Sequence, residues 1–276
     1  MPLMKSPFWR VLLPVILGWL ATSFTGTSGE MLVQYASVWK CQMFTNDPGT
    51  AWRETNYDDG AWLSGLGIFG APMDEPLPAA AVQDGATLNT PLPQQPGRED
   101  FYPAYYFRGK FTFAGPATHV LLTFSNVVDD GAVFYLNGEE LGPRLGMNPG
   151  PVSMTNFANR VVEVRTTGVE VFHVVPTNLL TGTNLLSVEL HNSSPVNHDV
   201  IFGLNLSWER LPVLNIRPEP NAVTLWWETS RPFVLEQAAH LEQSWTEVQP
   251  GGNPCTVSIT NGPSRFFRLR LAQTQP

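Results

Sequence analysis

Short apolar runs separated by turn residues fill the chain from about residue 105 onward. In 105–113, 119–127 and 132–136, aromatic and β-branched residues alternate in part with polar ones, and Gly or Pro punctuates the runs. Runs of the same kind occupy 160–166, 169–175, 184–192 and 200–208. No long helical periodicity follows residue 29. The pattern predicts an all-β fold of many short strands, a β-sandwich or jelly roll.

Local signals place some of the connections. Asn137-Gly138 follows the run 132–136, and this dipeptide is typical of a tight β-hairpin. The segment before residue 105 is less regular: 37–44 predicts a first strand, whereas the Pro-rich stretch 73–100 predicts a long loop.

The strand pattern restarts near Leu211-Pro212. With about 60 residues, this part is close to the lower size limit for an independent core, so we expect it to lean on the first domain. Trp226 and Trp227 are adjacent, and in a strand they would point in opposite directions, leaving one to face solvent or the other domain. The runs are 214–229, 231–241, 244–250, 255–260 and 265–271. We therefore expect a main domain over 30–209 and a small β domain over 210–276.

The first 29 residues have the pattern of a secretory signal peptide. Lys5 and Arg10 precede an apolar run over 11–24, and small residues follow. A membrane anchor is the alternative, but the run is short of the ~20 apolar residues of a spanning helix and contains Pro14 and Gly18. We expect cleavage between Ser23 and Gly29. The product would be secreted or held at the cell surface, extracellular or periplasmic, with no membrane span.

The formal net charge limits the classes of partner that the protein can bind. Without the two basic residues of the leader, 14 basic residues stand against 24 acidic ones, a formal net charge of −10. No basic stripe is available to release counterions from a nucleic-acid backbone, so we expect neither DNA nor RNA as a partner. With 43% hydrophobic residues, the composition is not that of a disordered chain.

The two cysteines, Cys41 and Cys255, are far apart in the sequence. In an exported protein they could form a disulfide that ties the start of the mature chain to its end. Two separate buried thiols are the alternative, and the sequence leaves the choice open.

The order of several motifs resembles a known family. SVWK, TAWRETNYDDGAWLSGLGIFG, YYFRGKF, VVDDGAVFYLNGEEL, LLTGTNLLSVELHN and HDVIFGLNLSWE follow one another between residues 37 and 209. This order is similar to that of galactose-binding-like jelly-roll modules of secreted bacterial proteins, related to the sugar-binding domain of β-galactosidase-type enzymes. Residues 211–273 resemble small fibronectin-like or immunoglobulin-like units. The resemblance implies a jelly-roll β-sandwich that binds carbohydrate, sometimes with a structural calcium ion. It does not imply catalysis.

Asp129-Asp130-Gly131 admits two interpretations. Adjacent carboxylates are hard oxygen ligands suited to calcium, which can in turn coordinate sugar hydroxyls, and a protective-antigen-type family of sugar-binding sandwiches uses an Asp-Asp pair at a comparable place. The alternative is a polar turn at a strand entry, because Asp bonds to its own backbone there and Gly131 relieves the backbone. We expect the pair to hold a turn at the rim, where the chain meets water. If a metal binds, Asp129 and Asp130 are the candidate ligands and calcium is the candidate ion.

Aromatic residues in or beside the long loops are candidates for sugar contact, because aromatic faces suit the C–H surfaces of sugars. Trp52 and Trp62 have the alternative of filling the core, whereas Tyr102 is expected to be exposed. Glu189 and His191 project to one face of a strand, and Arg108 could pair with them in a half-buried ion pair. The candidate ligand-binding residues are Trp52, Trp62, Tyr102 and Arg108.

These features favour a secreted, non-catalytic carbohydrate-binding or surface-adhesion module. One alternative is a structural component of a cell-surface or extracellular assembly that packs against copies of itself or a protein partner. Another alternative is an accessory module of a polysaccharide-degrading system. An enzyme with unrecognised catalytic residues is a third hypothesis, because perturbed carboxylates cannot be identified from a sequence.

Overall fold

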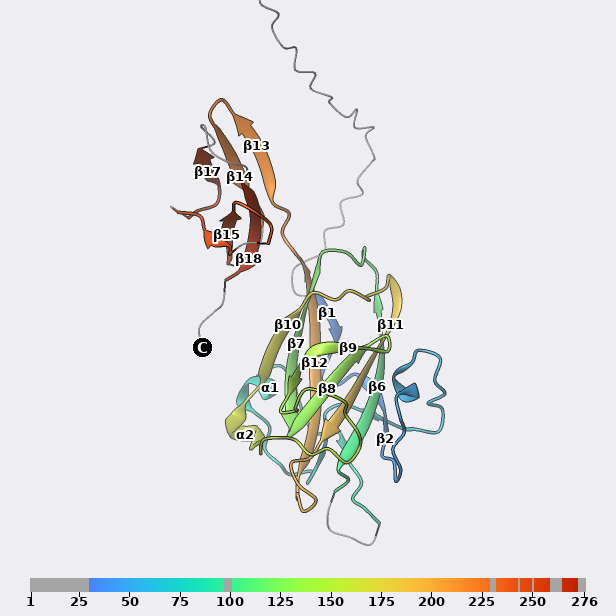
Figure 1. The fold of residues 1–276 in the computed structure, drawn as a ribbon. Helices are drawn as coiled ribbons and strands as arrows, with labels where there is room; N and C mark the ends of the chain where they lie inside the picture. Colours follow the sequence, from blue (N-terminus) through green and yellow to red (C-terminus); the bar gives the residue numbers. More distant parts are fainter. Residues whose placement is uncertain are drawn as a thin grey trace, which may run out of the picture.

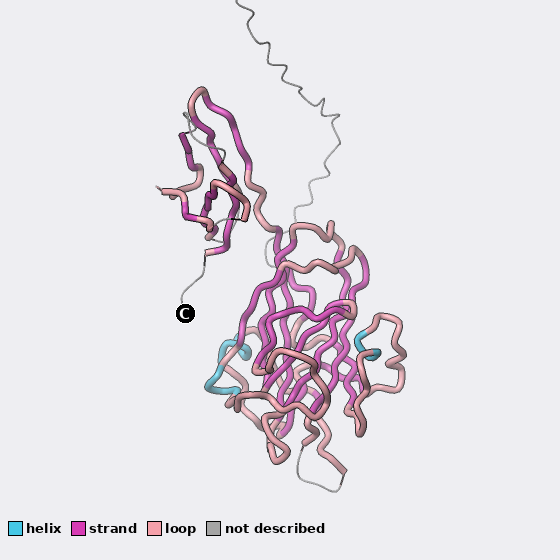
Figure 2. Tube along the Cα trace, viewed as in Figure 1, coloured by secondary structure: helices cyan, strands magenta, loops and turns pink. Residues whose placement is uncertain are grey.

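The structure is a computed structural model that describes residues 30–96, 101–228, 232–242, 244–249, 251–258 and 265–272. Strands dominate it, and helices occur only as short pieces beside the sheets (Figures 1 and 2). The predicted signal peptide and its cleavage site lie outside the described residues. Within these ranges, the structure contains no helix with the length and apolar character needed to cross a membrane.

The main sandwich consists of two sheets whose strands pair antiparallel, except for β4 and β5. Its strands are β1 (Glu30–Val33), β2 (Val38–Gln42), β3 (Leu63–Leu66), β4 (Phe69–Ala71), β5 (Thr90–Pro91), β6 (Ala104–Phe113), β7 (Val120–Asp129), β8 (Gly131–Leu136), β9 (Glu139–Leu145), β10 (Glu170–Val174), β11 (Gly182–His191) and β12 (Val200–Arg210). Sheet A has the order β10-β7-β12-β4-β5, with β1 also paired to β12 and β5 parallel to β4. Sheet B has the order β3-β2-β6-β11-β8-β9.

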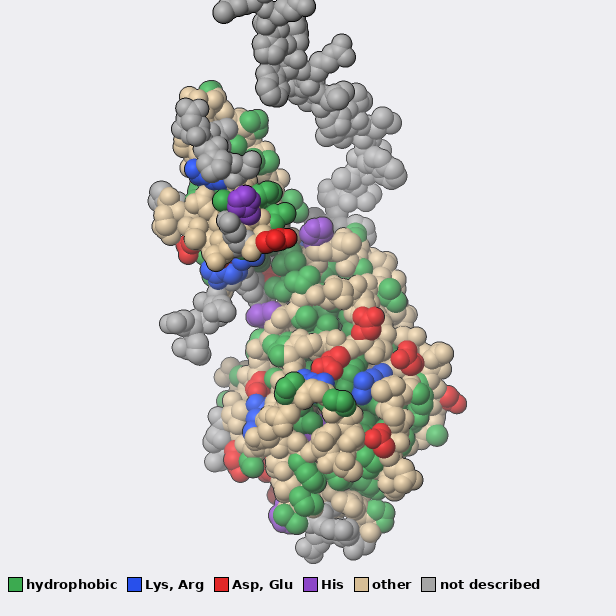
Figure 3. All heavy atoms as spheres, in the orientation of Figure 1, with side chains coloured by type: hydrophobic (Ala, Val, Ile, Leu, Met, Phe, Trp, Pro, Cys, Tyr) green, Lys and Arg blue, Asp and Glu red, His purple; other side chains and the backbone are tan. Residues whose placement is uncertain are grey.

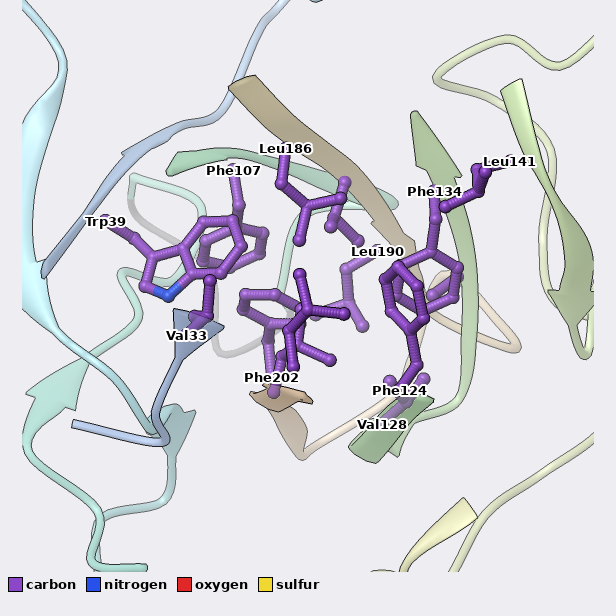
Figure 4. Packing of buried hydrophobic residues seen from close by; sticks show 14 of the residues in the cluster. Val33, Trp39, Phe107, Phe124, Val128, Phe134, Leu141, Leu186, Leu190 and Phe202 are labelled. Carbon is purple, nitrogen blue, oxygen red and sulfur yellow. The ribbon is translucent and has the colours of Figure 1, made fainter. Parts of the chain in front are cut away.

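Aromatic side chains from the two sheets interdigitate in the core (Figure 4). Phe202 of sheet A stacks on Phe107 of sheet B with ring centroids 4.2 Å apart, and it meets Trp39 edge-on at 5.2 Å. Gly109 is required beside Trp39, because a Cβ there would lie 2.8 Å from the indole. Each fully buried aromatic side chain contributes roughly 1.5–3 kcal/mol, so this layer supplies much of the stability.

The predicted hairpin is confirmed. Asn137 and Gly138 have φ of 48° and 94°, the positive values that a primed two-residue turn needs, and β8 pairs with β9 across them. The strand predicted over 160–166 is wrong, since that stretch ends in the short helix α2 (Val164–Thr167). Two of its three valines, Val162 and Val164, pack onto the outer face of sheet A and do not pair with a strand, while Val161 is exposed.

The Pro-rich stretch 73–100, predicted as loop, also contains regular structure. A short helix, α1 (Ala79–Gln83), covers the outer face of sheet A, where Ala81 packs against Tyr35 and Ile201. Strand β5 follows it. The described helices of the chain are the 3-10 turn η1 (Ala51–Arg53), α1 and α2, all short, in keeping with the absence of long helical periodicity after residue 29.

Two further three-stranded sheets follow residue 214, and we call them the C-terminal sandwich. Its strands are β13 (Asn215–Glu219), β14 (Ala222–Trp226), β15 (Phe233–Ala238), β16 (Thr246–Glu247), β17 (Cys255–Ser258) and β18 (Phe266–Leu271). Sheet C has the order β13-β14-β17 and sheet D the order β16-β15-β18. Leu225, Trp227, Leu235 and Val257 pack between them. The all-β sandwich fold is thus confirmed, while the division into two domains, with the second leaning on the first, stays a prediction.

The two cysteines are free thiols buried in different cores. Cys41 lies in the core of the main sandwich and Cys255 in that of the C-terminal sandwich. Burial raises the pKa of the Cys41 thiol far above its ordinary value. The structure therefore matches the alternative of two separate thiols, and the disulfide is not formed in it.

Candidate functional site

Arg108 anchors a loop on the outer face of sheet B. Its side chain is 1% exposed, and Nε donates to Asp59 Oδ2 at 2.7 Å. Nη1 donates to the carbonyl oxygens of Trp52 and Glu54, and Nη2 donates to that of Tyr57 at 3.4 Å. The guanidinium thus holds the segment 50–60 against the sheet. This corrects the expectation that Arg108 binds ligand, because its donors are engaged within the protein.

Trp52 and Trp62 lie beneath that loop and not at its surface. Trp52 is fully buried, with its ring centroid 4.8 Å from that of Tyr106 and 5.6 Å from that of Tyr135. Trp62 is 6% exposed and packs edge-on against Phe44. Both tryptophans fill a second apolar cluster between the loop and sheet B. Their predicted ligand-binding role is corrected accordingly, and the core-filling alternative holds.

Glu189 is the centre of a buried polar cluster on the same face. Register places it opposite Tyr106 and Val133, so its carboxylate faces the covering loop. One oxygen accepts a short hydrogen bond from the Tyr135 hydroxyl and lies 3.5 Å from Arg53 Nη2; the other lies 3.5 Å from His191 Nε2. The ion pair expected for Glu189 therefore forms with Arg53 and not with Arg108. Its contacts hold the loop down and leave little access from solvent.

Tyr102 is half-buried. Its ring meets that of Tyr105 edge-on at 5.8 Å, and its carbonyl oxygen accepts a hydrogen bond from Asn192 Nδ2 at 2.9 Å. Of the four predicted ligand-binding residues, it alone keeps part of its surface open. The structure does not bring it together with Trp52, Trp62 and Arg108 in one cavity among the described residues.

Asp130 holds the turn between β7 and β8, as expected, but it does so in the interior. Oδ1 accepts a hydrogen bond from the Val162 N–H at 2.6 Å. Oδ2 accepts bonds from the Ser193 N–H at 2.6 Å and from Asn197 Nδ2 at 2.9 Å. The side chain is fully buried, so the expectation that these carboxylates mark contact with water is wrong. Segments 160–162 and 192–197 fold over the turn and replace water as hydrogen-bond donors.

Asp129 is buried beside it, 1% exposed, and neither carboxylate oxygen accepts a hydrogen bond from a described residue. Burial, together with the neighbouring Asp130 and the negative charges of Asp199 and Glu75, raises the pKa of Asp129 to about 10. At neutral pH the side chain is therefore a neutral acid. A neutral acid can donate its proton to the adjacent Asp130 carboxylate.

The turn does not fit the calcium ion considered for it. Calcium needs oxygen ligands with free lone pairs, whereas both oxygens of the buried Asp130 carboxylate already accept backbone or amide hydrogens. Over the described ranges, no group of three His, Cys, Asp or Glu side chains is arranged to hold a metal ion.

An open groove lies on the C-terminal sandwich, where the sequence marked no site. It has a volume of about 390 Å³, within the range of small-ligand pockets. Its floor is the outer face of sheet C: register pairs Arg217 with Thr224 and Thr224 with Thr256, and Trp226 follows two residues along. The lining residues are Arg217, Thr224, Trp226, Trp227, Asn253 and Pro254.

Trp226 and Trp227 lie on opposite faces of the sheet, as strand alternation predicted. Trp227 is buried in the core, while Trp226 points to the other face and is half-buried. Asn253 fixes this strand end: its Nδ2 donates to the Trp227 carbonyl at 2.6 Å and its Oδ1 accepts from the Trp227 N–H at 3.2 Å. The groove thus presents an indole face on a rigid support.

Arg217 supplies the charge beside that indole. Its side chain is 66% exposed, and Nε donates to Glu219 Oε1 at 3.0 Å. This bond orients the guanidinium, whose terminal nitrogens donate to no described residue. The residues missed from the sequence were Arg217, Thr224, Asn253 and Pro254, because only the fold brings β13, β14 and the turn before β17 to one face.

Comparisons with known proteins give weak likenesses. No family model matches the chain, and no curated protein matches it. Among solved structures, a β-glycosidase from Bacteroides vulgatus is 15% identical with a TM-score of 0.39, covering 76% of this chain and 26% of its own. A Ruminococcus gnavus β-glucuronidase is 12% identical with a TM-score of 0.38, and the match covers 85% of this chain and 40% of the glucuronidase chain. A calcium-binding mutant of Bacteroides uniformis β-glucuronidase 2 is 11% identical with a TM-score of 0.42, covering 89% and 28%.

The chain spans less than half the length of each of these solved structures. Scores of this size do not establish a shared fold or a shared activity. The assignment as an all-β sandwich therefore rests on the strands and sheets of the chain itself.

Proposed function

We propose that the protein is an exported, non-catalytic carbohydrate-binding protein whose ligand stacks on Trp226 in the groove of the C-terminal sandwich. The observation that carries the proposal is the half-buried indole at the floor of an open groove, beside an oriented guanidinium. An indole face suits the C–H surface of a pyranose ring and excludes water from it at little ordering cost. The terminal nitrogens of Arg217 can donate to ring or hydroxyl oxygens at the edge of the stacked sugar.

The groups that line the groove suit binding. They offer one aromatic face, hydrogen-bond donors and a hydroxyl, whereas glycoside hydrolysis uses two carboxyl groups on either side of the bond. The leader pattern of residues 1–29 supports export to a compartment where polysaccharides occur. On the face that Figure 3 shows, acidic and basic side chains are scattered without a continuous basic stripe, consistent with a ligand other than nucleic acid.

A glycan-array screen of the exported chain tests the proposal, with Trp226→Ala and Trp245→Ala as matched variants. Trp245 is also half-buried in the C-terminal sandwich, but the Arg268 guanidinium lies over it, 4.3 Å from the ring centroid, and it does not line the groove. Loss of a central aromatic contact costs about 2 kcal/mol, or roughly 30-fold in Kd, so Trp226→Ala should lose the array signal. Trp245→Ala should keep it. An array without any signal, or one lost only in Trp245→Ala, would refute the proposal.

A second candidate function, assembly with other copies or a protein partner, is favoured by one observation. The edge of sheet B carries exposed apolar side chains: Val38 and Leu66 lie opposite each other on β2 and β3 and are 62% and 47% exposed. Exposed apolar edge strands are surfaces that can pair with another chain. Light scattering over a range of protein concentrations tests it, because assembly predicts a mass that rises with concentration.

A further inference from the structure

A second cavity lies on the main sandwich, on the outer face of sheet A. It has a volume of about 470 Å³ and lies where β1 leaves β12 and the end of α1 approaches. The register between β1 and β12 shifts after Met31, and the chain then turns at Gln34, where the Ser37 N–H donates to the Gln34 carbonyl at 2.8 Å. The lining residues are Met31, Gln34, Tyr35, Ala36, Asp84, Gly85 and Asn205.

Asn205 is the fixed polar group of this cavity. It lies on β12, and its Oδ1 accepts a hydrogen bond from the Tyr35 N–H at 2.7 Å. That bond sets the orientation of the amide. Nδ2 donates to no described residue, so an oriented donor is left for a ligand.

Asp84 supplies an acceptor on the opposite wall. It follows the last residue of α1, and its N–H donates to the Ala80 carbonyl at 3.1 Å, while Gly85 beside it has a φ of +82° that favours glycine. The Asp84 carboxylate is exposed and makes no ion pair with a described residue. Burial, with Asp84 nearby, raises the pKa of Tyr35 to about 12. The tyrosine is thus a neutral phenol whose hydroxyl, buried without a described partner, lies near the acidic wall.

The mixture of groups indicates the class of ligand. A carboxylate accepts two hydroxyl groups, an amide donates to a third oxygen, and the exposed Met31 and Ala36 give apolar contact. A cation would find a single carboxylate, and an anion would meet Asp84 without a basic side chain among the lining residues. A neutral molecule with several hydroxyls can donate hydrogen bonds to the Asp84 carboxylate and accept one from Asn205 Nδ2 at the same time. The volume is in the range of small-ligand pockets.

We infer that this cavity is a second binding site, which takes one neutral polyhydroxylated ring of hexose size between Asp84 and Asn205. It lies on the main sandwich and is independent of the groove at Trp226. A chain with both sites would hold a polysaccharide at two points, and its avidity would exceed that of either site where the span permits.

The test is saturation-transfer NMR on the exported chain with the methyl glycosides of glucose, galactose and mannose. The variants are Asn205→Asp, Asp84→Asn and Trp226→Ala. Asn205→Asp keeps the Oδ1 acceptor for the Tyr35 N–H but removes the Nδ2 donor. Asp84→Asn changes an exposed residue and should fold, so it still tests the cavity if Asn205→Asp does not fold. Thermal unfolding checks that each variant is native.

At least one glycoside should show transfer to the parent, and its binding should weaken at least tenfold in Asn205→Asp and in Asp84→Asn. Trp226→Ala should leave it unchanged. The inference is overturned by three results: no transfer from any of the glycosides, binding that is unaltered in both cavity variants, or binding lost in Trp226→Ala. The last result would assign the ring to the groove, so failure of the cavity is distinguished from failure of the proposed function.

Discussion

The buried pair Asp129 and Asp130 predicts how folding stability depends on pH, and Asp129→Asn tests this prediction. Asp129 has a pKa raised to about 10 by burial and by the Asp130 carboxylate beside it. An acid whose folded pKa is raised stabilises the fold fully below its unfolded pKa, and this stability is lost as pH rises towards the folded pKa. About three pH units separate the unfolded pKa of about 3.9 from pH 7, and each is worth about 1.4 kcal/mol.

Folding of the parent therefore carries a penalty of up to about 4 kcal/mol at pH 7, which is an upper limit because local relaxation reduces it. Asparagine has nearly the shape of the neutral acid, can donate to Asp130, and carries no such penalty. We expect Asp129→Asn to gain stability relative to the parent as pH rises from 4 to 7. At about pH 3 the gain should have vanished.

Urea unfolding of the parent and the variant across this pH range measures the difference, in which the titration of other carboxylates largely cancels. Asp130→Asn is the matched control, since Asp130 accepts three hydrogen bonds and its replacement should destabilise by at least about 2 kcal/mol. A difference between parent and Asp129→Asn that stays constant from pH 4 to 7 would refute the argument. So would a variant that becomes relatively less stable as pH rises.

Three further predictions concern the loop, the metal and the leader. Arg108→Met should destabilise the protein by about 3–5 kcal/mol, because it leaves Asp59 and several loop carbonyls without their buried cation. Thermal unfolding measures this loss of stability. An unchanged melting temperature would exclude the anchoring role. Calorimetric titration with calcium should give no binding heat, in the parent or in Asp130→Ala; tight binding in the parent that Asp130→Ala abolishes would restore the metal site. N-terminal sequencing of exported protein should begin between Ser23 and Gly29, and a start at Met1 would contradict the signal peptide.

The fold was largely predictable, because many of its strands are set by local signals. Alternation and the Asn137-Gly138 turn fixed β8 and β9, and the paired tryptophans at 226 and 227 divided between core and surface as period two requires. The strand predicted over 160–166 was wrong for a physical reason. Val162 and Val164 cover a sheet from outside, and an apolar cover has the same composition as a strand.

The candidate site was less predictable, because its residues are brought together by tertiary contacts. Sequence alone marked Trp52 as a loop residue and placed Arg108 in a strand run, but could not show that the loop folds down onto sheet B. It placed the Asp129-Asp130 turn correctly, yet its burial depends on segments 160–162 and 192–197, far along the chain. The groove at Trp226 depends likewise on a turn some 27 residues beyond it.

The central claim is that a carbohydrate stacks on Trp226, and calorimetric titration tests it most directly. The oligosaccharide with the strongest array signal would be titrated into the parent, Trp226→Phe and Trp226→Ala. The account predicts that phenylalanine, which keeps an aromatic face, retains most of the affinity, and that alanine weakens Kd by roughly 30-fold, about 2 kcal/mol. Equal affinities in the parent and in Trp226→Ala would contradict it.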